Sequence, residues 1–270
     1  MKDFHLHIIS DGTGDTAYRM LQAAMAQFQE DVVITRYTNV REESQLRAIL
    51  SAAASQPSLV AYTFVTEELK RSLERLAPEQ GVESIDLLGP LMQKLAAFFD
   101  KPPTARPGLL HQVDGEYFAR ISAIEYAIRH DDGHSVDDLK SSEIVLVGVS
   151  RTSKTPLSIY LAQDGWKVAN VPIVAGAKLP KQLFEIAQHR IVGLTMNPGR
   201  LAEIRKIQLR QEGREDSQYA NPEQIREELD YAHSIYAQNP TWPVIDVFGK
   251  SIEEISQEVL DRLVGRGRRL

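Results

Sequence analysis

The sequence contains no cysteine among its 270 residues. Thiolate nucleophiles, disulfide bonds and cysteine-ligated zinc are therefore excluded, and a reducing, cytoplasmic location is expected. Long apolar runs are also missing, since none approaches the roughly 18 residues that a membrane-spanning helix needs. The first residues, MKDFHLHIISDG, are expected to form a strand and not a signal peptide, because histidines and Asp11 interrupt the apolar run.

Positive charge is in deficit, with 31 Lys and Arg residues against 37 Asp and Glu residues and a net charge of −6. Bulk electrostatic attraction to nucleic acid or to an anionic membrane is not favoured, so neither is expected as a partner. The hydrophobic share of 43% and the charged share of 25% are typical of a soluble globular protein. A chain of this length forms a sufficient core without disulfides or a structural metal.

Short apolar runs alternate with segments of helical periodicity, and this alternation occurs twice along the chain. Strands are expected at Phe4–Ile9, Val32–Tyr37, Leu59–Val65, Val82–Leu87, Ile144–Val149, Lys167–Ile173, Arg190–Thr195 and Val244–Val247. Helices of the second half are expected at Tyr117–His130, Pro156–Gln163, Pro180–Gln188, Gly199–Glu212, Pro222–Gln238 and Ser251–Val264. This pattern predicts parallel sheets with helices on both faces and with ligand-binding loops at one edge.

The segment Asp100–Gly108, DKPPTARPG, carries three prolines and a glycine, which a helix or central strand cannot accommodate. A domain connection is placed near it. The prediction is an α/β protein of two domains: residues 1–112, an N-terminal α/β domain that contributes to target binding, and residues 113–270, a parallel-sheet phosphate-loop (P-loop-like) domain that binds nucleotide and carries catalysis. No internal sequence repeat is visible.

The stretch Ile144–Tyr160 joins an apolar strand to a helix through the loop GVSRTSKT. The phosphate-binding loop pattern is Gly, four residues, Gly, Lys and Ser or Thr, and only its second glycine is missing, because Ser153 stands there. Such a loop directs backbone N–H groups and a helix N-terminus at phosphate oxygens. The predicted cofactor-binding residues are Gly148, Val149, Ser150, Arg151, Thr152, Ser153, Lys154 and Thr155.

Three side chains of this loop have individual roles in the prediction. Lys154 contacts a terminal phosphate, the Thr155 hydroxyl holds Mg²⁺, and Arg151 adds a forked donor for phosphate oxygens. The alternative is a strand–helix turn rich in hydroxyl groups with a surface lysine and arginine. Glycine takes positive φ at little cost, so Ser153 leaves open a loop of different shape.

Acidic residues form the other candidate sites. Asp131 and Asp132, before Gly133, could hold Mg²⁺ or act as a base, or could simply end a helix. Asp246 resembles the strand-end acid that supports Mg²⁺ in phosphate-loop proteins. The turn Ile8–Ala17, IISDGTGDTA, is either an anion-binding nest or a capped turn, and its acids Asp11 and Asp15 argue against phosphate.

Five blocks, in order, resemble one known family: the bacterial and plastid pyruvate, phosphate dikinase regulatory proteins, also known as the phosphoenolpyruvate synthase regulatory proteins. The blocks are ISDGTGDTA (Ile9–Ala17), FARISAIEYAIRHDDG (Phe118–Gly133), GVSRTSKTPLSIYLA (Gly148–Ala162), GLTMNPGRLAEIRK (Gly193–Lys206) and PVIDVFGKSIEEIS (Pro243–Ser256). The resemblance covers essentially the whole chain. The loop sequence SRTSKTP resembles the dikinase branch of the family more than the synthase branch. In the dikinase branch, serine is common at the position of Ser153.

The resemblance implies a bifunctional enzyme. ADP serves as the donor that phosphorylates a threonine beside the catalytic histidine of the target, and inorganic phosphate removes that group again as pyrophosphate. It also implies that Gly148–Thr155 is the ADP site. A threonine hydroxyl needs a base, and Asp131 or Asp132 is assigned that role beside Lys154 and Arg151. Mg²⁺ is the expected metal, with Thr155 and Asp246 as ligands. The target is pyruvate, phosphate dikinase or phosphoenolpyruvate synthase.

Two other functions remain open on the sequence. One is a phosphate-loop kinase of a small metabolite, and the other is an ADP-binding regulator without catalysis. A metabolite kinase would turn over without a protein partner, whereas a sensor would bind ADP without turnover. Self-association as a homodimer is one arrangement that the sequence leaves open.

Overall fold

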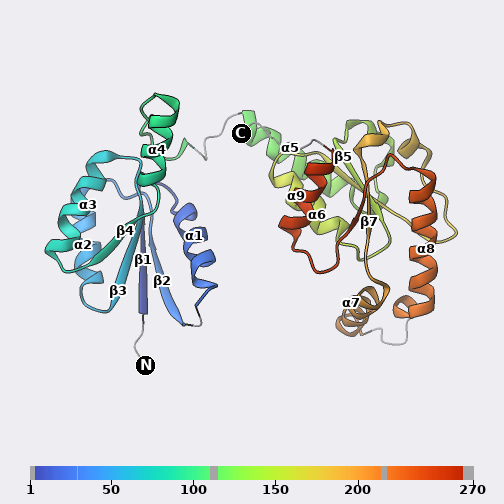
Figure 1. Cartoon of the computed structure of the whole chain (residues 1–270), viewed down its shortest axis with the longest axis horizontal. Helices are drawn as coiled ribbons and strands as arrows, with labels where there is room; N and C mark the ends of the chain where they lie inside the picture. The colour runs from blue at the N-terminus through green and yellow to red at the C-terminus, as the bar shows by residue number, and fades with distance from the viewer. Residues whose placement is uncertain (1–3, 29, 110–114, 214–217, 264–270) are drawn as a thin grey trace. The chain divides into compact units, whose positions relative to one another are not determined.

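The computed structural model describes residues 4–28, 30–109, 115–213 and 218–263 (Figure 1). The chain divides into two compact units, residues 1–112 and 113–270, called here the N-terminal and C-terminal units. Each unit contains a four-stranded, fully parallel sheet. The predicted α/β class with parallel sheets is confirmed. In the described ranges no helix is both long and apolar enough to cross a membrane.

The N-terminal unit has helices on both faces of a sheet with strand order β2-β1-β3-β4. Ala17 and Leu21, four residues apart on one face of α1, pack against Leu6 and Ile8 of β1, and helices α2 and α3 cover the other face. Its elements are β1 (Phe4–Ser10), α1 (Asp15–Met25), β2 (Val32–Tyr37), α2 (Glu43–Ala53), β3 (Ser58–Thr63), α3 (Glu67–Glu79), β4 (Glu83–Asp86) and α4 (Gly89–Phe99).

The C-terminal unit has the strand order β6-β5-β7-β8. Its elements are α5 (Gly115–Arg129), the 3₁₀ turns η2 (Asp131–Gly133) and η3 (Val136–Ser141), β5 (Ile144–Gly148), α6 (Lys154–Gln163), β6 (Val168–Pro172), the 3₁₀ turns η4 (Lys181–Phe184) and η5 (Gln188–Arg190), β7 (Ile191–Thr195), α7 (Pro198–Gln211), η6 (Gln218–Ala220), α8 (Pro222–Gln238), β8 (Val244–Asp246) and α9 (Ile252–Leu263). Helix α6 contacts both α5 and α9, and α7 contacts α8 (Figure 1).

Strand β5 runs through the middle of this second core, and every one of its residues is buried. A parallel strand covered by helices on both faces has to be apolar throughout, which explains the run IVLV. Tyr236 of α8 reaches the sheet and donates its hydroxyl to the carbonyl oxygens of Val147 and Leu194. Gly193 leaves room for that ring, because a Cβ there would lie 2.8 Å from it. Helix α8 is thereby held against the strands that lead into the site.

The two sheets share one topology, although the sequence shows no repeat. In each, the first strand of the unit lies between the second and the third. The first strand therefore ends at an inner position in both units, and its turn into the next helix lies at the carboxyl edge where parallel sheets bind ligands. These turns follow β1 in one unit and β5 in the other.

The predicted helix Pro180–Gln188 is wrong. Only a short 3₁₀ turn, Lys181–Phe184, forms there. The side-chain amide of Gln188 donates to the carbonyl oxygens of Leu183 and Ile186, at 3.1 and 2.8 Å. These local bonds satisfy carbonyl groups that a continuing α-helix would have used.

Candidate functional site

The turn between β5 and α6 contains two residues with side chains in the left-handed conformation. Helix α6 begins at Lys154, and its N-cap residue Ser153 has a left-handed conformation with φ of 63°. Arg151 is also left-handed, with φ of 70°. Ser153 therefore has the positive φ that glycine takes in the common pattern, in a conformation that is costly for a residue with a side chain.

Gly148 is required where β5 enters this turn. A Cβ at that position would lie 2.8 Å from the carbonyl oxygen of Leu194 and 2.8 Å from Thr152 Oγ1. Thr152 is fully buried and donates its hydroxyl to the carbonyl oxygen of Val149 at 2.9 Å. The turn thus closes tightly against β7, and any side chain at Gly148 would push it open.

Lys154 lies inside the turn. Its side chain is only 5% exposed, and Nζ donates to the carbonyl oxygen of Val149 at 2.8 Å. Burial lowers the pKa of Lys154 to about 8, although the nearby carboxylates of Asp132 and Asp131 oppose that effect. A phosphate group in the turn would supply the negative charge that this buried ammonium lacks.

Asp131 lies beside the start of α6. The Thr155 hydroxyl donates to its carboxylate at 2.9 Å, and the amide of Asn170 on β6 donates to the same carboxylate. Asp131 reaches this place because the backbone N–H of Asn170 donates to the carbonyl oxygen of His130, which ties turn η2 to β6. Asp132 follows in a left-handed conformation, with φ of 53°, and its side chain is exposed.

A cavity of about 530 Å³ lies beside both acids and five residues of the loop. It is lined by Asp131, Asp132, Ser150, Arg151, Ser153, Lys154, Thr155, Pro156, Asn170 and Ile204. A second cavity, of about 690 Å³, shares Ser153 and Ile204 with the first and extends to residues 247–250 after β8. The two cavities adjoin at Ser153, the N-cap residue of α6, and such an arrangement suits a reaction between two substrates.

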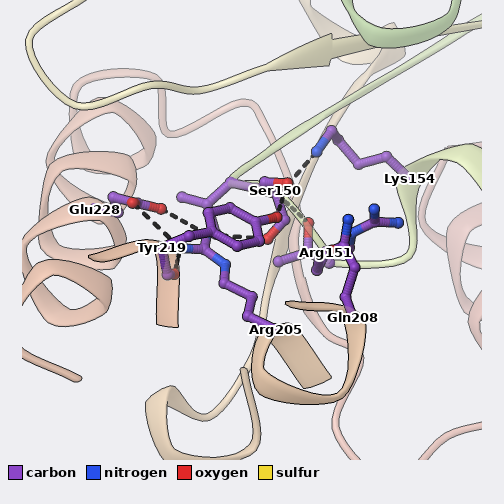
Figure 2. A network of polar contacts seen from close by, with 9 residues as sticks. Ser150, Arg151, Lys154, Arg205, Gln208, Tyr219 and Glu228 are labelled. Atoms are coloured by element: carbon purple, nitrogen blue, oxygen red, sulfur yellow. Dashed lines mark hydrogen bonds and ion pairs between the residues drawn. The ribbon is translucent and has the colours of Figure 1, made fainter. Parts of the chain in front are cut away.

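Arg205 of α7 contacts the backbone of the turn and holds it in place. It is fully buried and pairs with Glu228 at 2.6 Å, and it donates to the Ser150 carbonyl oxygen at 3.2 Å. The Tyr219 hydroxyl lies 2.6 Å from Ser150 Oγ, and the Arg205 guanidinium lies over the Tyr219 ring. Figure 2 shows Glu228, Tyr219 and Ser150 grouped around Arg205, with Arg151 hydrogen-bonded to Gln208 beside them.

Sequence reasoning did not find Arg205, Glu228 or Asn170. A signal for Arg205 did exist, because it follows Leu201 by four residues and precedes Leu209 by four, on the buried face of α7. A charged residue at a core position of a helix needs buried partners. Those partners can be identified only from the fold. Asn170 interrupts the apolar strand VANVP in the same way.

Asp246 is not brought beside Thr155. It ends the edge strand β8, separated from β5 by β7, and its carboxylate accepts the backbone N–H of Phe248 at 2.9 Å. Thr155 instead contacts residues on the β6 side. Within the described parts of the chain, no three His, Asp or Glu side chains are grouped closely enough to hold a metal. A metal in this cavity would need neutral oxygen ligands as well.

The turn after β1 leads into α1, whose N-cap residue Gly14 makes no side-chain cap hydrogen bond. Asp11 is buried and accepts hydrogen bonds from the backbone N–H groups of Val65 and Thr66 and from the Thr66 hydroxyl. Asp15 pairs with Arg19 on the surface of α1. The Asp11 carboxylate thus fastens its turn to the start of α3.

A parallel sheet with a P-loop-like turn at an inner strand, and an aspartate bonded to the threonine of that turn, defines the class: a P-loop-like α/β protein. Comparison with known proteins gives the family. Residues 6–260 match the model of the kinase/pyrophosphorylase family. The chain belongs to this family, so the resemblance predicted from five sequence blocks is confirmed.

Similar proteins can be aligned with nearly the whole chain. A provisionally named pyruvate, phosphate dikinase regulatory protein of Geobacter sulfurreducens is 42% identical over 263 residues, which cover 97% of this chain and 98% of the relative. Proteins with the same provisional name from Geotalea uraniireducens and Bdellovibrio bacteriovorus are 43% and 42% identical, over 95% and 98% of this chain and 96% and 95% of their own.

Proposed function

We propose that this chain regulates pyruvate, phosphate dikinase in the cytoplasm by reversible phosphorylation of a target threonine. ADP is the phosphoryl donor in the inactivating reaction, and inorganic phosphate is the acceptor in the activating reaction, which releases pyrophosphate. The turn at Gly148–Thr155, with Lys154 buried inside it and an aspartate at its threonine, carries the proposal. The names of the relatives support the choice of target.

Phosphoryl transfer to the target requires a base. The threonine Oγ forms a bond to the β-phosphorus of ADP, the bond from that phosphorus to the bridging oxygen breaks, and AMP leaves with the electron pair. Asp131 or Asp132 accepts the hydroxyl proton, since both line the cavity that contains Lys154. Lys154 and Arg151 neutralise the phosphate charge while the group moves.

The opposite reaction needs no such base. An oxygen of inorganic phosphate attacks the phosphothreonine phosphorus, the bond to Oγ breaks, and the threonine oxygen takes up a proton while pyrophosphate leaves. Phosphate is an anion near neutral pH, so its oxygen attacks without losing a proton first. One charge-neutralising site therefore serves both directions.

The decisive test uses the dikinase with its catalytic histidine phosphorylated, ADP labelled at the β-phosphate, and the full chain. Label in a threonine of the dikinase, with AMP released only when the dikinase is present, is the expected result. Phosphoenolpyruvate synthase is tested in parallel, and labelling of that protein alone would overturn the choice of target. AMP release without either protein would indicate a metabolite kinase, and ADP binding without turnover would indicate a sensor.

A further inference from the structure

Ser150 and Arg151 of the turn are held by three side chains that do not line the cavity beside it. The Arg205 guanidinium of α7 donates to the Ser150 carbonyl oxygen at 3.2 Å, and Gln208, also on α7, accepts from Arg151 Nε. The Tyr219 hydroxyl of η6 lies 2.6 Å from Ser150 Oγ. The left-handed backbone of Arg151 costs energy and persists only where neighbouring groups enforce it.

Arg205 is an unusual residue for its place, because it is fully buried on a helix face that is otherwise apolar. It pairs with Glu228 at 2.6 Å, but its Nε is also buried and has no hydrogen-bond partner among the described residues. Taking an ion pair out of water costs about as much free energy as the pair returns, and an unbonded donor adds to that cost. Stability alone therefore does not explain a charged residue here, whereas contact with the turn does.

The hydrogen bond from Arg205 fixes the direction of one peptide unit. The peptide bond between Ser150 and Arg151 is trans, so its C=O and N–H point in opposite directions. Because Arg205 holds the carbonyl oxygen, the Arg151 N–H points away from Arg205. Within the described parts of the chain this N–H has no acceptor, and Ser150 and Arg151 both line the cavity beside Lys154. Such an N–H is free to donate to a phosphate oxygen.

We propose that Arg205, paired with Glu228, is a positioning residue that holds the Ser150–Arg151 peptide with its N–H toward a phosphate group of the ligand. This inference rests on the proposed nucleotide site. Arg205 acts on ADP binding in the kinase direction and on inorganic phosphate binding in the phosphorylase direction, and it touches neither ligand. Without Arg205 the peptide unit can rotate, Arg151 leaves the left-handed conformation, and the site loses one phosphate donor.

The test replaces the ion pair by an apolar pair in the full chain. Arg205→Met combined with Glu228→Leu removes one charge of each sign, so the net charge around the turn does not change. The double variant should melt at or above the temperature of the parent chain. Its dissociation constant for ADP, measured by calorimetry, should nevertheless rise about 10-fold, which corresponds to the loss of one hydrogen bond to a charged group.

Arg190→Met is the matched control. Arg190 likewise donates to a carbonyl oxygen, that of Ser142, but at the edge of the same sheet where β5 and β7 begin. Parallel strands end at the opposite edge, where the turn lies. The control should bind ADP within about 2-fold of the parent chain.

A nuclear magnetic resonance signal separates positioning from a general loss of structure. In the parent chain, ADP and inorganic phosphate should each move the Arg151 amide proton downfield, because a hydrogen bond to a charged oxygen deshields it. The double variant should lack this shift at saturating ligand, while the amide signals of β5 keep their positions. The KM for inorganic phosphate in the phosphorylase reaction should rise by a factor similar to that for ADP.

Arg205→Lys decides the question if the double variant does not fold. Lysine keeps the charge beside Glu228, but its side chain is shorter and has no fork, so it cannot bond to Glu228 and the Ser150 carbonyl oxygen in the same way. The ADP dissociation constant should rise at least about 5-fold, and the shift of the Arg151 amide should be reduced.

Parent-like ADP affinity in the folded double variant, or in Arg205→Lys where the double variant is unfolded, would overturn the positioning role and leave the nucleotide site in place. Weaker ADP binding with an unchanged Arg151 shift, or an equal loss in Arg190→Met, would overturn it as well. A parent chain that binds neither ADP nor inorganic phosphate would overturn the proposed function itself.

Discussion

The turns after β1 and β5 occupy the same topological position in two sheets of identical strand order. Both lead into a helix whose N-cap residue is left-handed, Gly14 with φ of 73° and Ser153 with φ of 63°. Their side chains differ in charge. The first turn buries Asp11, whose carboxylate accepts three hydrogen bonds from Val65 and Thr66 just before α3, whereas the second buries Lys154 and is supported by Arg205.

This difference teaches that topology supplies a place for a ligand but not its chemistry. A helix start at a sheet edge presents backbone N–H groups in either unit. A buried carboxylate repels phosphate, and a buried ammonium attracts it. Matched substitutions in the two units test whether the chemistry resides in the second turn alone.

The largest effect is expected for Lys154→Met. Loss of the buried ammonium should lower the rate of ADP-dependent phosphorylation about 100- to 1,000-fold, because it neutralises charge on the transferred group. The control is a lysine of the N-terminal unit outside the compared turn, Lys70 on α3, which pairs with Asp86 at 2.9 Å. Lys70→Met should cost about 3 kcal/mol of unfolding free energy by leaving Asp86 unpaired, and should leave ADP affinity unchanged. Denaturant titration measures the loss of unfolding free energy, and a binding titration measures ADP affinity. Loss of ADP-dependent activity in Lys70→Met but not in Lys154→Met would contradict the comparison.

Removal of the candidate base, Asp132 or Asp131, should affect the kinase and phosphorylase rates unequally. Asp132→Asn is expected to lower the kinase rate about 100-fold and the phosphorylase rate much less, since only the threonine hydroxyl needs a base. Asp131→Asn tests the other candidate base and should likewise depress the kinase rate more than the phosphorylase rate. Rates of label transfer and of pyrophosphate release measure this ratio, and equal losses in both directions would exclude a base role.

In the N-terminal unit, the acid to compare with Asp131 and Asp132 is Asp11, in the turn after β1. Asp11→Asn should lower the free energy of unfolding by about 1–3 kcal/mol, because Val65 and Thr66 lose a charged acceptor. The ratio of kinase to phosphorylase rates should not move. A change in that ratio would mean that the first turn takes part in the chemistry.

A smaller effect is expected at the glycines of the two turns. Gly148→Ala forces a Cβ to within 2.8 Å of a backbone oxygen and should cost about 1–3 kcal/mol of stability and about 10-fold in ADP affinity. Gly12→Ala meets only Ser10 Oγ, at 3.7 Å, and should be neutral within about 0.5 kcal/mol. Thermal melts with and without ADP check both, and similar costs at the two positions would refute the difference in packing.

The smallest effect is a proton taken up on binding. Burial lowers the pKa of Lys154 to about 8, below its ordinary value. Phosphate in the turn favours the ammonium and raises that pKa, so ADP binding at about pH 8.5 should take up a fraction of a proton. Calorimetry in two non-phosphate buffers of different ionisation enthalpy measures it. Lys154→Arg keeps a cation that cannot lose its proton and should show no such uptake from this position. Proton release by the parent chain would contradict the assigned cause.

Much of the fold follows from periodicity. Alternating apolar runs and helical segments predict the parallel sheets, and the spacing from Gly148 to Thr155 predicts a phosphate-type turn between a strand and a helix. The prediction of a helix at Pro180–Gln188 failed because Gln188 bonds to carbonyl groups that an α-helix would have used. The order of strands places β7 between β8, which ends at Asp246, and β5, which leads to the loop with Thr155, so a shared metal role of the two residues stays a prediction.

The sequence by itself determined the fold class, the loop and the family, since each of these depends on consecutive residues whose spacing is visible in one dimension. Only the tertiary structure decided which groups surround the loop. Asp131 lies 24 residues from Thr155 and 39 from Asn170, and Arg205 lies 55 residues from Ser150. Such contacts depend on strand order and helix packing, because a buried charge or amide is stable only where the fold brings its partners to it.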